Sequence, residues 1–207
     1  MPDWSHEIAA GADRGHVVCG IDEVGRGPLA GPVLACAVIL DIAVFDRDLA
    51  ARINDSKKLS PERRAEFSAA LRGCARFGLG TATVAEIDAI NILQATHLAM
   101  RRAVAALNTT LDHALIDGNR GPKLDCAATC IVKGDQKSLS IAAASIIAKV
   151  ERDKIMRELG KRHTGYGWER NAGYGTEAHL DAIKRLGVTP EHRRSFRPVY
   201  EQLTLNH

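Results

Sequence analysis

Five short apolar runs, separated by polar or glycine-containing turns, predict five β-strands. They are rich in valine, isoleucine and other residues that favour strands. The runs cover residues 17–21, 33–40, 77–84, 113–117 and 129–132. Because they are almost continuously apolar, we expect the first run and the last two to be buried strands.

Longer patterns between and after these runs predict helices. Ser60-Pro61 is typical of a helix start, with serine as the cap and proline at the first helical position. Residues 86–107 carry apolar side chains at three- and four-residue spacing, which indicates an amphipathic helix. A third helix is expected from Ser140 to about residue 159, and two shorter helical patterns begin at Thr176 and Thr189.

The order of these elements predicts the fold class. Three strands come first, and the last two alternate with helices. This order favours an α/β fold, a mixed sheet with helices on both faces and with its last strands parallel. Residues 1–15 are polar and lack periodicity, so we expect a loose N-terminal leader. Residues 16–160 then form the main domain, and the glycine- and aromatic-containing residues 161–207 form a C-terminal helical subdomain.

Composition excludes some classes of protein. The chain has 207 residues, 45% of them hydrophobic and 26% charged, which is an ordinary globular mixture. No stretch is long and apolar enough to predict a membrane span, and the net charge of +3 is too small to indicate nucleic-acid binding alone. The five cysteines form no C-x-x-C pair, so we expect reduced, mostly buried thiols. We also expect a cytoplasmic protein that does not bind a membrane.

Acidic residues follow three of the predicted strands. Asp22 and Asp117 end apolar runs directly, and Asp135 follows a third run after a short link. Ligands of α/β sheets bind at the carboxyl ends of strands, so the three acids converge if their strands are adjacent. Glu23 joins them only if its strand breaks there, because neighbouring residues of a strand point to opposite faces.

Four converging carboxylates need a cation, because desolvated like charges repel. Hard oxygen ligands suit Mg²⁺ or Mn²⁺, and two such ions could hold a phosphodiester between them for attack by water. The alternative for Asp117 and Asp135, each beside a glycine, is an ordinary turn residue. The adjacent acids Asp22-Glu23 are harder to explain as turn chemistry.

The glycine-rich segment 25–32 follows this acidic pair. It contains a G-x-G-x-x-A pattern, but Pro28 and Pro32 interrupt it and a strand follows where a phosphate-binding helix would begin. A dinucleotide site is therefore disfavoured. The remaining alternatives are a structural turn or a loop that, with Arg26, approaches a sugar-phosphate backbone closely.

Residues 20–33 resemble the opening signature of the ribonuclease HII family, with Val24 where alanine is common. Further segments resemble family motifs in the family's order: 55–60, 116–119, 133–135, 143–150, 173–176 and 189–196. The resemblance extends from about residue 16 to residue 200. It implies a ribonuclease H-like fold, with a five-stranded mixed β-sheet flanked by helices and a small C-terminal helical region.

The resemblance also implies an activity. It is a metal-dependent hydrolysis of the RNA strand of RNA/DNA hybrids, with cutting at single ribonucleotides embedded in duplex DNA, that leaves 5′-phosphate and 3′-hydroxyl ends. The cofactor implied is Mn²⁺ or Mg²⁺, and the enzyme is expected to act as a monomer. Residues implied to bind metal and catalyse are Asp22, Glu23, Asp117 and Asp135. Residues implied to contact the 2′-hydroxyls and the sugar or base at the RNA–DNA junction are Gly25, Arg26, Gly27 and Tyr174.

Other hypotheses remain open from the sequence. Another nuclease of the same fold would share the acids but would have no use for 2′-hydroxyl recognition, and a non-catalytic hybrid-binding module would have no use for the acids. Among the remaining residues, Trp168 is expected to anchor a loop on the core. The basic residues between 184 and 197 either contact phosphate or form a solvated face. Lys149 and Asp153, four residues apart, are expected to pair.

Overall fold

Five strands pair side by side in the order β3-β2-β1-β4-β5 in the computed structural model, which describes residues 2–53 and 60–205. The β1–β2 and β2–β3 pairs are antiparallel, whereas β1–β4 and β4–β5 are parallel. This confirms the predicted five-stranded mixed sheet with parallel last strands. The strands are β1 (Val18–Val24), β2 (Val33–Ile39), β3 (Arg76–Ala82), β4 (His113–Asp117) and β5 (Ala127–Ile131).

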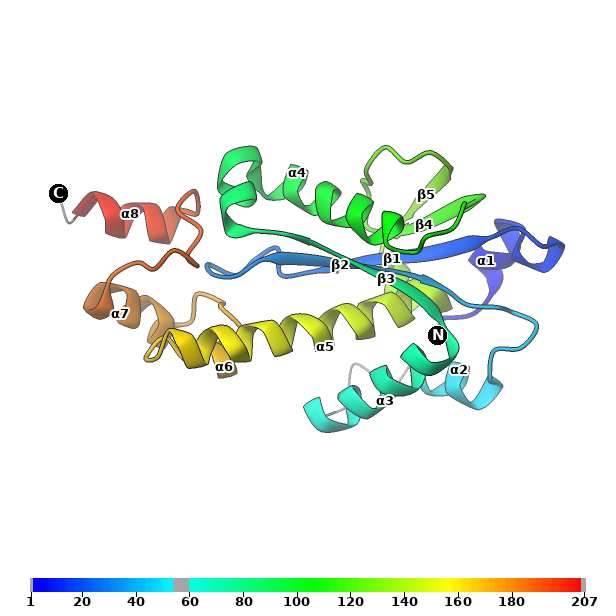
Figure 1. Cartoon of the computed structure of the whole chain (residues 1–207), viewed down its shortest axis with the longest axis horizontal. Helices are drawn as coiled ribbons and strands as arrows, with labels where there is room; N and C mark the ends of the chain where they lie inside the picture. The colour runs from blue at the N-terminus through cyan, green and yellow to red at the C-terminus, as the bar shows by residue number, and fades with distance from the viewer. Residues whose placement is uncertain (1, 54–59, 206–207) are drawn as a thin grey trace.

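Helices cover both faces of the sheet, with α4 on one side and α5 on the other (Figure 1). Because successive side chains of a strand point to opposite faces of the sheet, the core consists of two clusters, one under α4 and one under α5. Ile21 of β1 packs with Ile87 of α4, whereas Leu34 of β2 packs with Ile147 of α5. The helices are α1 (Ser5–Ala9), α2 (Arg47–Ile53), α3 (Pro61–Cys74), α4 (Val84–Ala105), α5 (Leu139–Arg162), α6 (Trp168–Asn171), α7 (Glu177–Leu186) and α8 (Arg197–Leu205).

The helix α4 is interrupted at Asn91, which has φ 66° and ψ 163°. The Asn91 Oδ1 atom accepts the N–H groups of Leu93 at 3.0 Å and Gln94 at 3.2 Å, so Asn91 caps the second half of the helix. At the start of α4, Thr83 and Glu86 form a reciprocal capping box. The helix therefore begins two residues before the predicted position, because the capping box fixes it there.

The strand β5 lies at the edge of the sheet, and this corrects the prediction that it is buried. Four of its five residues are exposed, and Val132 just after it is 57% exposed. The strand pairs only with β4 in the described part of the chain. Its apolar composition resembles that of a central strand, but no helix covers it as α4 and α5 cover β1 and β2.

The N-terminal segment, for which the sequence predicts a loose leader over residues 1–15, contains the short helix α1 and contacts the start of α5. Glu7 of α1 is only 2% exposed. Its Oε1 atom accepts hydrogen bonds from the Ser138 hydroxyl at 2.6 Å and from the Ser140 N–H at 2.9 Å. The carboxylate thus satisfies amide and hydroxyl groups at the start of α5, a contact across more than 130 residues that local periodicity cannot show.

The C-terminal helices pack on the far half of α5 and on the loop between β1 and β2. Trp168 is fully buried among Met156, Tyr166 and Ile183, which confirms its predicted role as an anchor. Thr176 caps α7 as predicted, but no helix begins at Thr189. Residues 189–196 form turns instead, and the next helix, α8, begins at Arg197. The boundary between the main domain and the C-terminal subdomain at residue 160 stays a prediction.

Three further expectations have mixed outcomes. No helix within residues 2–53 and 60–205 is long and apolar enough to cross a membrane. The cysteines are all free, but only Cys19 and Cys36 are buried, so the prediction of mostly buried thiols is wrong. Lys57 and Lys58, with most of the 55–60 motif, lie outside the described residues.

Candidate active site

Asp22 and Asp117 lie at the same level on adjacent parallel strands. Ile21 of β1 pairs with Ile116 of β4, and the two aspartates are the next residues of their strands. Asp22 is 6% exposed, and its carboxylate is close enough to those of Glu23 and Asp117 for mutual repulsion. The predicted convergence of acids at the carboxyl ends of these two strands is therefore present.

Glu23 is close enough to Asp22 and Asp117 for electrostatic repulsion, although its strand does not have the break that the sequence prediction required. The strand β1 continues to Val24, so Asp22 and Glu23 point to opposite faces of the sheet. Asp22 lies on the α5 face, where Ser145 donates a hydrogen bond to it. Glu23 lies beside Arg26, with 3.3 Å between Oε1 and Nη1, and Asp117 interacts electrostatically with both acids.

Burial dominates the electrostatics of the two β1 acids. Burial raises the pKa of Asp22 to about 7; the Ser145 hydrogen bond opposes this, and the nearby Glu23 and Asp117 carboxylates add to it. Burial also raises the pKa of Glu23, against the effect of the Arg26 guanidinium. The Glu23 Oε2 atom is buried and has no hydrogen-bond partner among the described residues. An unpartnered buried carboxylate oxygen is costly unless a cation binds it.

The fourth predicted acid, Asp135, lies in a turn whose first N–H group donates a hydrogen bond to Asp117. Asp117 Oδ1 accepts the N–H of Gly134 at 2.6 Å, and Asp135 is the next residue, half-buried in a single turn of 3₁₀ helix (Gly134–Gln136). In the described part of the chain, no three His, Cys, Asp or Glu side chains lie closely enough together to hold a metal ion. Asp22 accepts the Glu23 N–H at 2.8 Å, Asp117 accepts the Gly134 N–H, and Glu23 pairs with Arg26.

These residues fit a divalent cation. Their donor atoms are hard carboxylate oxygens, which Mg²⁺ and Mn²⁺ prefer, and Glu23 Oε2 is buried with no hydrogen-bond partner in the part of the chain that the structure describes. Glu23 and Asp117 also line a cavity of about 270 Å³, together with Arg26, His97 and Arg120. This cavity has both the carboxylates for a cation and the basic groups for a phosphate chain.

The predicted substrate loop and Tyr174 lie side by side. A side-chain carbon at Gly27 would be 3.4 Å from Tyr174 Cε1, and the Leu29 N–H donates to the Gly173 carbonyl at 2.8 Å. Tyr174 is 47% exposed, so its ring is accessible to a ligand. The structure thus brings Gly27 and Tyr174 together, although 147 positions separate them in the chain.

The buried His179 contacts the Tyr174 backbone, and the buried His192 packs against His179. His179 Nδ1 lies 2.8 Å from the Tyr174 carbonyl, so it carries the proton, and its Nε2 accepts the Trp168 N–H at 2.9 Å. His192 Nδ1 accepts the Thr189 N–H at 3.0 Å, and its Nε2 lies 3.2 Å from His179 Nε2. Each tautomer is fixed by its partners, and both rings are neutral in this arrangement.

Sequence reasoning missed several of these positions. Ser145 and His179 carry no motif signal for their contacts with Asp22 and Tyr174. Arg193 was a candidate for phosphate contact, but it is completely buried, and so is Arg152 of α5. The predicted pair Lys149 and Asp153 is confirmed, with 2.7 Å between Nζ and Oδ1.

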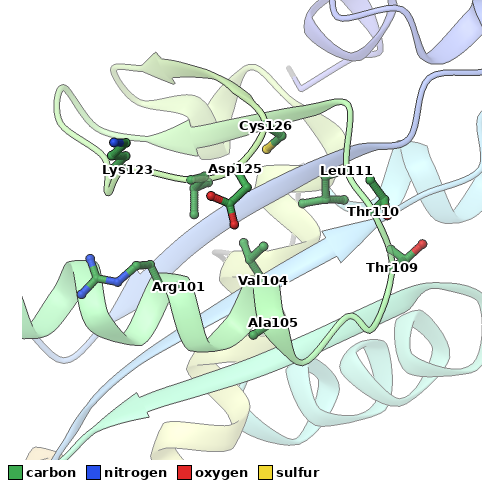
Figure 2. Close-up of a pocket in the computed structure, with 10 residues that line it drawn as sticks. Arg101, Val104, Ala105, Thr109, Thr110, Leu111, Lys123, Asp125 and Cys126 are labelled. Carbon is green, nitrogen blue, oxygen red and sulfur yellow. The ribbon is translucent and has the colours of Figure 1, made fainter.

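A separate cavity of about 440 Å³ lies between the end of α4 and the connections around residues 109–111 and 123–126 (Figure 2). Arg101 comes from α4, and Lys123 and Asp125 come from the connection between β4 and β5. Asp125 is the one acid among the described residues that line it. A lone carboxylate gives this cavity no metal-binding set, so the candidate active site is the one at the strand ends.

A five-stranded mixed sheet with helices on both faces, and with Asp22 and Asp117 side by side on its central parallel strands, is the architecture of the ribonuclease H-like class. A family model described as Ribonuclease HII matches residues 19–202. The chain therefore belongs to the ribonuclease HII family. Its enzymatic activity is the divalent-metal-dependent endonucleolytic hydrolysis of the RNA strand of RNA/DNA hybrids, and the hypothesis of a non-catalytic binding module is set aside.

Individual relatives agree with this family. A protein named Ribonuclease HII from Paramagnetospirillum magneticum is 58% identical over 98% of this chain and 99% of its own length. A crystal structure of ribonuclease H2 from Pyrococcus horikoshii OT3 has a TM-score of 0.74 and 26% identity, covering 91% of this chain and 97% of the other. A structure of Bst-RNase HIII in complex with Mn²⁺ has a TM-score of 0.72 at 18% identity, over 92% of this chain and 70% of the other, and shows the common fold.

Proposed function

We propose that Asp22, Glu23, Asp117 and Asp135 together hold the divalent cation needed for hydrolysis. One observation supports this assignment. Asp22 and Asp117 lie next to each other in the register of two adjacent parallel strands, and Glu23 Oε2 nearby has no hydrogen-bond partner among the described residues. Asp135 follows the residue whose N–H binds Asp117, so a small adjustment of this turn would add its carboxylate.

Mn²⁺ or Mg²⁺ is the proposed cofactor, because both prefer carboxylate oxygens. When bound, such an ion supplies a Lewis acid that polarises the scissile phosphate and makes water a better nucleophile. The chain's own contribution is to hold the acids in a dry, rigid setting. Burial keeps Asp22 out of water, and the Ser145 hydrogen bond orients its carboxylate.

The proposed substrate surface consists of Gly25, Arg26 and Gly27 with the ring of Tyr174. Gly27 leaves room beside the Tyr174 ring for a sugar-phosphate backbone to approach, and the loop can hydrogen-bond to the 2′-hydroxyl that distinguishes RNA from DNA. The exposed Tyr174 ring is placed to pack on the sugar or base at the junction between ribonucleotide and deoxyribonucleotide. We infer from this surface that a single ribonucleotide embedded in duplex DNA is also a substrate, and that cutting leaves 5′-phosphate and 3′-hydroxyl ends.

We also propose that the enzyme works as a monomer in the cytoplasm. Five free cysteines, two of them exposed, are compatible with a reducing compartment. Sedimentation at micromolar concentration should give a mass near the 22.4 kDa of one chain. A concentration-independent mass of twice that value would contradict the monomer.

A cleavage assay on four matched duplexes tests the proposed function. The duplexes carry an all-RNA strand, four ribonucleotides, one ribonucleotide or DNA alone, and each is assayed with Mg²⁺, Mn²⁺ or a chelator. We expect cutting of the three RNA-containing duplexes with metal and of none with chelator. Cutting of the all-DNA duplex, or cutting that persists after metal removal, would contradict the proposal.

A further inference from the structure

A buried arginine from the C-terminal region holds the substrate loop by its carbonyl groups. Arg193 Nε donates to the Gly31 carbonyl at 3.0 Å, Nη1 donates to the Arg26 carbonyl at 2.9 Å, and Nη2 donates to the Gly25 carbonyl. The Arg193 side chain is completely buried. All three of these loop carbonyls therefore point inward, toward one guanidinium.

A second buried arginine, from α5, holds the rest of the same loop. Arg152 Nε donates to the Pro32 carbonyl at 3.1 Å, Nη2 donates to the Ala30 carbonyl at 3.2 Å, and Nη1 donates to the Ala172 carbonyl at 3.0 Å. The last bond links the loop to the segment that leads into Tyr174. Gly25 has φ +92°, and a side chain there would collide with the Arg152 guanidinium.

Neither guanidinium has a carboxylate partner within 4 Å among the residues that the structure describes. Burial lowers the pKa of Arg193 to about 9 and that of Arg152 to about 10, so both stay charged at neutral pH. Burying a charge that only carbonyl groups solvate is costly. A functional reason for two positive charges below this loop is therefore needed.

The direction of the peptide groups supplies such a reason. In a planar trans peptide the C=O and N–H groups point in opposite directions. Because the Gly25 and Arg26 carbonyls point inward to Arg193, the N–H groups of Arg26 and Gly27 point outward. Within residues 2–53 and 60–205, no backbone acceptor lies opposite either N–H group. Two adjacent outward N–H groups above buried positive charge form a site for an oxygen-rich ligand.

We propose that Arg193 and Arg152 are positioning residues for substrate recognition, which turn the N–H groups of Arg26 and Gly27 toward the ribose 2′-oxygen and the neighbouring phosphate. This inference rests on the proposed function and adds the device that makes the loop selective. Arg193 contributes geometry through three bonds that only a guanidinium fork can make together. Both arginines also contribute positive charge beneath the loop. This charge attracts the negatively charged nucleic-acid strand that the loop is proposed to bind.

The test compares the preference for a duplex with one ribonucleotide over the same all-DNA duplex. Binding is measured by fluorescence anisotropy in the Asp22→Asn background, and kcat and KM are measured without that change. In Arg193→Lys the charge remains but a lysine cannot reach three carbonyls. We expect the ribonucleotide preference to fall about tenfold, equal to about 1.4 kcal/mol, with the loss in KM larger than the loss in kcat.

Arg102→Lys is the matched control. Arg102 also donates to a backbone carbonyl, that of Thr81 at 2.7 Å, and to Glu86, but it lies on α4 and contacts no part of the substrate loop. It should lower the melting temperature without changing the ribonucleotide preference. If Arg193→Lys weakens binding of both duplexes equally, as a structural role predicts, the inference is overturned.

Two further outcomes separate the possible failures. If the Arg193→Lys variant does not fold, the same measurement is made on Arg152→Lys, which loses bonds to the Ala30 and Pro32 carbonyls. An unchanged ribonucleotide preference in that variant also overturns the inference. If the unmodified enzyme has no preference for the ribonucleotide, the proposed function fails first, and the role of the arginines in recognition fails with it.

Discussion

The ring of Tyr174 lies against Gly27, so that a side-chain carbon at position 27 would be 3.4 Å from Tyr174 Cε1. Nearly half of the tyrosine side chain stays exposed despite this contact. The ring and the glycine loop therefore form one continuous surface beside the acids at the ends of β1 and β4. Substitutions on this surface should affect recognition of the sugar, and substitutions of the acids should affect the chemical step.

Tyr174→Ala should weaken cutting at a single embedded ribonucleotide more than it weakens general duplex binding. Loss of one stacked ring costs roughly 1–3 kcal/mol, which is about 5- to 150-fold in kcat/KM. Tyr174→Phe is the control, because it keeps the ring and should keep most of the activity. Cleavage kinetics on single-ribonucleotide duplexes and anisotropy on DNA duplexes give the two quantities. Equal losses in both would exclude a role at the junction.

Asp22→Asn should abolish cleavage and yet stabilise the metal-free protein. The carboxylate is buried beside Glu23 and Asp117, and burial raises its pKa from 3.8 to about 7. The folded protein therefore loses stability as the pH rises between these values, and the full loss is present at pH 8. An amide removes this charge. We expect kcat to fall by at least ~10²–10³-fold and the melting temperature at pH 8 to rise by roughly 2–4 °C per kcal/mol of relieved repulsion. Full activity, or a melting temperature well below that of the unmodified protein, would refute this expectation.

Added Mn²⁺ or Mg²⁺ should raise the melting temperature of the unmodified protein. A ligand that binds only the folded state stabilises it by about 2.7 kcal/mol at one hundred times its Kd. Asp117→Asn should lose this shift, whereas Glu158→Gln, which changes an exposed carboxylate paired with Lys161, should keep it. Differential scanning fluorimetry with increasing metal measures both. If added metal raised the melting temperature of both variants equally, the metal would bind at a site that does not include Asp117.

The buried histidine pair, His179 and His192, predicts acid sensitivity. Burial, with smaller effects from His179 and His163, lowers the pKa of His192 to about 4, against about 6.5 for an unfolded histidine. Between these pH values the unfolded chain binds more protons, so this contribution to stability is present above pH 6.5 and is lost as the pH falls toward about 4.

Urea unfolding followed by tryptophan fluorescence at several pH values from 7 to 4 measures this loss. His192→Gln should be less stable at pH 7, because its packing is imperfect, but its stability should depend less on pH across this window. The same pH dependence in both proteins would show that His192 does not contribute to acid sensitivity.

The sequence by itself determined the sheet and the positions of Asp22 and Asp117 on it. Strand segments are short and locally patterned, so alternation and β-branched residues located all five within a few positions, and the carboxyl ends of β1 and β4 followed from that. The motifs around Asp22 and Asp117 carried the family resemblance. These features depend on residues close together in the chain, and a sequence pattern records such features directly.

Only the tertiary structure decided which charged side chains are buried and what they hold. Arg193 belongs to a basic run typical of a solvated face, yet it binds carbonyls at least 162 positions away. Glu7 likewise caps the start of α5 from a segment without periodicity, and β5 is an exposed edge strand although its sequence is apolar. The physical reason is the same for all three. Burial depends on which distant segment covers a residue, and a buried charge is tolerated only where that segment supplies its hydrogen bonds.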